Sequence, residues 1–136
     1  AVTQSSLAYL LRNRGQYDEA ERLYRASLAF SEAIGDSRGV AVTNVGLADL
    51  LAAKGEVQAA VDLYQSSLAL FQQINDLMSL GATLTRLAQL ALRVQQPADA
   101  VPLLQQAQAL FTQLKATQWL AQVAQLLDAA QSHTGD

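Results

Sequence analysis

Residues 7–30 read LAYLLRNRGQYDEAERLYRASLAF, and residues 47–70 read LADLLAAKGEVQAAVDLYQSSLAL, so the same apolar positions return after about 40 residues. Residues 87–110, LAQLALRVQQPADAVPLLQQAQAL, keep the spacing but fewer of the residue identities. One position is occupied by alanine in all three copies, as Ala20, Ala60 and Ala100. The copies align without a gap, which predicts an array of structural repeats.

Each copy has the apolar spacing of two helices. In the first copy, apolar residues recur at steps of three and four, as at Ala20, Leu23 and Tyr24, and strand-like alternation is absent. Gly15 and Gly55 lie between the two helices of their copies, where glycine suits a left-handed helix cap. The pattern predicts an all-α chain of about seven helices, near residues 2–14, 17–34, 37–54, 57–74, 77–94, 97–114 and 117–132.

The helices group into three predicted repeats, over residues 1–36, 37–76 and 77–116, followed by a terminal helix and tail over 117–136. The terminal helix has Trp119 and several aliphatic residues on one side and glutamines largely on the other. This pattern fits a capping helix or the first helix of a truncated fourth repeat. Because the chain begins at Ala1 inside a helical pattern, we expect it to be a fragment of a longer protein.

The third copy departs from the others at its prolines. Pro97 fits the first turn of a helix. Pro102 removes one hydrogen bond if that helix begins at Pro97, and a start near Asp99 avoids this conflict.

Composition argues against several classes of protein. Apolar residues make up 51% of the chain and charged residues 15%, which predicts a packed core. The absence of cysteine excludes a disulfide framework and a cysteine-ligated metal site. The net charge of −3 argues against nucleic acid as a partner. No apolar run approaches the roughly 20 residues that cross a bilayer. We expect no membrane partner and a cytoplasmic location.

Groups suited to catalysis are sparse. His133, the only histidine, lies in the predicted tail, and no cysteine is present as a nucleophile. Ser27 and Ser67 occupy a small-residue packing position between paired helices. The glycines are scattered and form no phosphate-binding loop. The sequence therefore predicts a protein that is not an enzyme and has no cofactor and no metal site.

The pattern Gly15-x-Tyr17-x-Glu19-Ala20, with Tyr24 and Ser27-Leu28 after it, resembles the tetratricopeptide repeat. The resemblance covers nearly the whole chain. Extra residues around 34–41 make the repeats similar to the long repeats of kinesin light chains, spindle-orientation adaptors and bacterial signalling regulators. The resemblance implies a right-handed superhelical solenoid of antiparallel helical hairpins, in which the first helix of each hairpin lines a concave groove.

The resemblance also implies which residues line that groove. They are Ser5, Tyr9, Arg12, Asn13, Val45, Asp49, Thr85, Arg86, Gln89, Arg93, Gln122 and Gln125. Arg86 and Arg93 suit acidic side chains or a C-terminal carboxylate. The carboxylate clamp of heat-shock co-chaperones would fall on Ser5, Tyr9, Gly46, Ala82 and Arg86. Only Arg86 has suitable chemistry, so we expect no binding of that type of peptide tail.

Three functions compete at this point. The first is a protein-interaction scaffold that binds a partner peptide or helix, as part of a larger bacterial regulatory or scaffold protein. The second is a repeat segment of a transcription regulator that senses a small molecule. The third is a self-associating structural module, which would make the chain a homo-oligomer.

Overall fold

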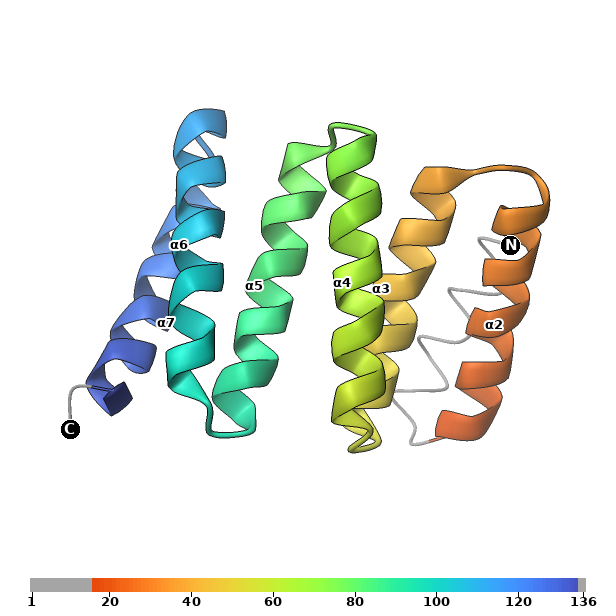
Figure 1. Cartoon of the computed structure of the whole chain (residues 1–136), viewed down its shortest axis with the longest axis horizontal. Coiled ribbons are helices and arrows are strands. Elements are labelled where there is room, and N and C mark those ends of the chain that lie inside the picture. Colours follow the sequence, from red (N-terminus) through yellow and green to blue (C-terminus); the bar gives the residue numbers. More distant parts are fainter. Residues whose placement is uncertain (1–15, 135–136) are drawn as a thin grey trace. The chain divides into compact units, whose positions relative to one another are not determined.

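The computed structural model describes residues 16–134, and every regular element in that range is an α-helix (Figure 1). The helices are α2 (Tyr17–Ala33), α3 (Ser37–Ala53), α4 (Val57–Gln73), α5 (Leu77–Arg93), α6 (Pro97–Leu114) and α7 (Thr117–Thr134). Their ends lie within two residues of the predicted ends. The predicted helix over residues 2–14 lies outside the described residues, which accounts for six helices here instead of about seven.

Left-handed backbone conformations end the helices. The angle φ is positive at Gly35 (71°), Gly55 (86°), Asn75 (60°), Gln95 (62°) and Lys115 (56°). Glycine adopts this conformation without a clash, whereas the other three residues accept some strain. The cap predicted at Gly55 is therefore present. Gln95, which stands at the corresponding position of the third repeat, keeps the same backbone conformation despite its side chain.

Aspartates begin two of the helices. The Asp36 carboxylate accepts a hydrogen bond from the backbone N–H of Gly39 at 2.9 Å, and Asp76 accepts one from the N–H of Ser79 at 3.2 Å. These bonds satisfy N–H groups that have no partner inside the helix. They fix the points at which α3 and α5 begin.

Helix α6 begins at Pro97 and carries Pro102 in its interior, so the later start near Asp99 is not used. Pro102 is exposed, as is Ala98, whose carbonyl would otherwise accept the missing hydrogen bond. Water can therefore satisfy that carbonyl, which keeps the cost of the internal proline low.

The chain forms two compact units that divide between Ile74 and Asn75. In the described part of the first unit, α3 packs against both α2 and α4. Leu47 and Leu50 of α3 have no exposed surface, and Phe71 of α4 is 2% exposed. The Ser67 hydroxyl of α4 donates to the carbonyl of Ala41 at 2.9 Å, so this buried serine joins two helices, as its packing position predicted.

In the second unit, α6 packs against both α5 and α7. Phe111 of α6 is fully buried and stacks on Trp119 of α7, with ring centroids 5.0 Å apart and planes 14° apart. Gly81 of α5 lies under the same ring. A Cβ at Gly81 would stand 2.7 Å from Phe111 Cζ, so the glycine allows the two helices to approach closely.

Candidate functional site

The predicted partner-binding residues fall in three groups. Ser5, Tyr9, Arg12 and Asn13 lie outside the described residues. Val45 and Asp49 lie on α3 in the first unit, and the remaining six lie on α5 and α7 in the second unit. The surface is described for each unit by itself.

On α3, the solvent-facing side is apolar at one end and acidic further along. Val42 is 54% exposed, and Val45, Gly46 and Asp49 are half-buried. Gly46 leaves room for the ring of Tyr24 from α2, since a Cβ there would stand 2.6 Å from Tyr24 Cε1. Gly46 therefore has a packing role, although its position suggested contact with a ligand as an alternative.

The Asp49 carboxylate is held from below by α4. The hydroxyl of Tyr64, which is 3% exposed, donates a hydrogen bond to Asp49 Oδ1. A charge-assisted bond from a buried hydroxyl fixes the carboxylate in one orientation on a half-buried surface. Asp49 therefore contributes a fixed negative charge to the surface of α3.

On α5, the structure separates one predicted residue from the other three. Thr85 is 1% exposed, and its hydroxyl donates to the carbonyl of Gly81 one turn earlier at 2.9 Å. Its side chain is thus part of the packing and does not reach a partner. Arg86, Gln89 and Arg93 are exposed.

On α7, both predicted residues, Gln122 and Gln125, are exposed. α7 also contacts α5 directly, so the two leading helices of the second unit are neighbours. Met78, at the start of α5, is 41% exposed, which sequence reasoning missed. Its position 40 residues after exposed Arg38 was the available signal.

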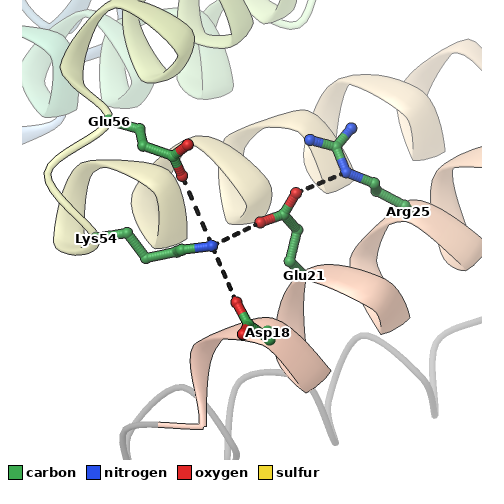
Figure 2. Close-up of polar contacts among 5 residues, drawn as sticks. All are labelled: Asp18, Glu21, Arg25, Lys54 and Glu56. Atoms are coloured by element: carbon green, nitrogen blue, oxygen red, sulfur yellow. Dashed lines mark hydrogen bonds and ion pairs between the residues drawn. The ribbon is translucent and has the colours of Figure 1, made fainter.

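A cluster of charges at the other end of the first unit joins three helices (Figure 2). Lys54 Nζ, which follows α3, lies 3.0 Å from a Glu21 oxygen and 3.2 Å from an Asp18 oxygen, both on α2. Glu56, before α4, is 3.6 Å from the same ammonium, and Arg25 binds Glu21 at 2.9 Å. Sequence reasoning did not find this cluster, because its members are more than 30 residues apart.

Mutual hydrogen bonding stabilises the charged forms in this cluster. The hydrogen bond from Lys54 lowers the pKa of the Glu21 carboxyl, against a smaller opposing effect of burial. The hydrogen bonds to Glu21 and Asp18 raise the pKa of Lys54. Both groups are therefore more firmly charged at neutral pH than they would be alone, and the cluster fixes α2 on the α3–α4 turn.

Within residues 16–132, no group of three or more acidic or histidine side chains is arranged to hold a metal ion. No described helix is both long and apolar enough to cross a membrane.

Short turns, antiparallel pairing and alternating leading and trailing helices define a helical-hairpin repeat protein. The tetratricopeptide repeat sequence profile matches residues 1–73, more than half of the chain. The chain therefore belongs to the tetratricopeptide repeat family, as the residue pattern predicted.

Solved structures agree on the fold. BtubC (BKLC) from P. vanneervenii superposes with a TM-score of 0.87 at 23% identity, over 98% of this chain and 56% of that one. A putative kinesin light chain from Podosopora anserina, described as having nearly identical TPR-like repeats, gives a TM-score of 0.71 at 25% identity. That match covers 96% of this chain and 68% of the other. These likenesses confirm the all-α hairpin solenoid class.

This chain spans just over half the length of BtubC. No curated protein sequence matches it.

Proposed function

We propose that the chain is a protein-interaction module that binds a segment of a partner protein on the solvent-facing sides of its leading helices. Repeats of this family generally mediate interactions between proteins, which supports the coarse assignment. The observation that carries the finer one is in the second unit. There, α5 and α7 contact each other and expose arginine and glutamine side chains at Arg86, Gln89, Arg93, Gln122 and Gln125.

These residue types suit recognition of a polypeptide. Arginine is enriched among the residues that dominate binding energy at interfaces. A glutamine side chain both donates and accepts hydrogen bonds, so it can pair with the backbone of an extended segment. The exposed side of α6, a trailing helix, carries glutamines but no basic residue. The leading helices are therefore the better candidates for the binding surface.

Selection from a displayed peptide library, followed by NMR titration of the labelled chain, tests the proposal. We expect enriched peptides to shift amide signals of α3, α5 and α7. Gln122→Ala on α7 should weaken binding, and the matched control Gln105→Ala, an exposed glutamine of α6, should leave it unchanged. Signals that move only on α4 and α6 would contradict the proposed surface. A library without binders, together with a metabolite that raises the Tm, would favour the sensing function.

A further inference from the structure

Helix α5 is the only described helix with basic residues and no acidic residue, and its two charges are both arginines. Arg86 and Arg93 are exposed, and Gln89 lies between them on the same side because residues three, four and seven apart share a helix face. The other helices of the described chain either carry acids or have no charge of this sign on their leading side. The exposed side of α5 is thus a cationic strip defined by Arg86, Gln89 and Arg93.

The acids of the second unit lie away from this strip. Asp76 precedes α5 at its opposite end from Arg93, where it caps the helix. Asp99 lies in the first turn of α6. Asp128 on α7 follows Gln122 by six residues, which places the two about 120° apart around the helix. The glutamines Gln122 and Gln125 therefore accompany the cationic strip on α7, and the described acids of this unit do not.

The spacing of the arginines sets a length. Seven residues of α-helix rise about 10.5 Å, so the bases of the Arg86 and Arg93 side chains are separated by about that distance along α5. An extended chain rises about 3.3 Å per residue, so acids three residues apart lie about 10 Å apart. The two distances match. A guanidinium carries five N–H donors, so it can hold a carboxylate together with another acceptor.

From these observations we infer that the cationic strip of α5, with the glutamines of α7 beside it, binds an acidic, extended segment of the partner protein. Two carboxylates three residues apart pair with Arg86 and Arg93, and Gln122 and Gln125 bind the backbone of the segment. This inference rests on the proposed function and names the partner chemistry for one of its surfaces. Charge complementarity selects the occupant, because a neutral or basic segment gains nothing from the arginines.

NMR titration of the full chain with three capped twelve-residue peptides tests the inference. The first peptide carries two glutamates three residues apart in a glycine–serine–alanine background, the second carries them side by side, and the third has lysines in their place. We expect the first to bind best, the lysine peptide not to bind, and affinity to fall as salt rises. The shifted amides should lie on α5 and α7.

Single-charge variants locate the binding. Arg93→Gln and Arg86→Gln should each weaken binding of the first peptide about threefold to fivefold, as for an exposed ion pair. Lys115→Gln, which removes an exposed cation at the α6–α7 turn, is the matched control and should have no effect. Equal binding of the lysine peptide, equal loss in Lys115→Gln, or no loss in either arginine variant would overturn the inference. If library-selected neutral peptides still shift α5 and α7, the proposed function stands and only the acidic partner is wrong.

Discussion

Helices α3 and α7 occupy equivalent places in their repeats, but the side that is buried on α3 is wet on α7. Ala48 and Leu51 of α3 are 0% and 3% exposed, because α4 packs over them. The repeat register places Asp128 and Gln131 at these positions of α7, and both are exposed. A helix that packed on α7 as α4 packs on α3 would have to bury the Asp128 carboxylate, at a cost of several kcal/mol. The polar side of α7 is the pattern of a capping helix.

The largest expected effect comes from moving the aspartate of α7 onto α3. Ala48→Asp places a carboxylate in a fully buried position with no room for water. It should lower the free energy of unfolding by more than about 4 kcal/mol, whereas Asp128→Ala should change it by about 0.5 kcal/mol or less. Urea denaturation followed by circular dichroism measures both.

If Ala48→Asp does not fold, Ala48→Ser still tests the comparison. It buries only a hydroxyl and should cost about 1–3 kcal/mol. Equal stability of Ala48→Asp and Asp128→Ala would show that α4 does not cover α3 as described.

The second comparison contrasts Gly81 of α5 with Ala121 of α7, which share one repeat position. Gly81→Ala should destabilise the chain by about 1 kcal/mol, because crowding of the buried Phe111 ring exceeds the gain in helix propensity. Ala121 is exposed, so Ala121→Gly should cost a similar amount through propensity alone. Thermal unfolding measures both changes. A Gly81→Ala variant more stable than the parent would mean that Phe111 can move off Trp119.

The third comparison concerns Asp49, whose position is alanine, Ala129, in α7. Tyr64→Phe removes the hydroxyl that donates to Asp49 and should destabilise the first unit by about 1 kcal/mol. In an Asp49→Ala background the same change should have a much smaller effect, which a double-mutant cycle by urea denaturation measures. Additive effects of the two substitutions would show that the hydrogen bond contributes nothing to stability.

The smallest effect concerns the charge cluster that joins α3 to α2. The folded-state pKa of Glu21 is lowered, so its stabilising contribution is present above the ordinary carboxyl pKa and is lost as pH falls through the lower, folded-state value. Glu21→Gln should therefore lower the Tm by about 1–2 °C at pH 7 and by less near pH 3. Thermal unfolding at the two pH values tests this, with Glu32→Gln, an exposed acid of α2, as the control. A Tm difference that grows in acid would contradict the assignment.

The positions of the helices could be predicted because each end has a local cause, such as Asp36 at a helix start or Gly55 at a turn. The burial of Thr85 could not be predicted in the same way. Its hydroxyl is satisfied by the carbonyl of Gly81, so a polar residue is tolerated where the helix is covered. The ion pairs of Lys54 and the stacking of Phe111 on Trp119 depend on how separate helices meet, which apolar spacing does not specify.

The wet side of α7 also sets a direction for engineering. The repeats follow one another without a gap, and the covered side of α5 already accepts a trailing helix. A designer who wished to lengthen the array would therefore duplicate residues 77–116 and insert the copy ahead of α7. Appending a hairpin behind α7 would first require replacement of Asp128 and Gln131 by small and aliphatic residues.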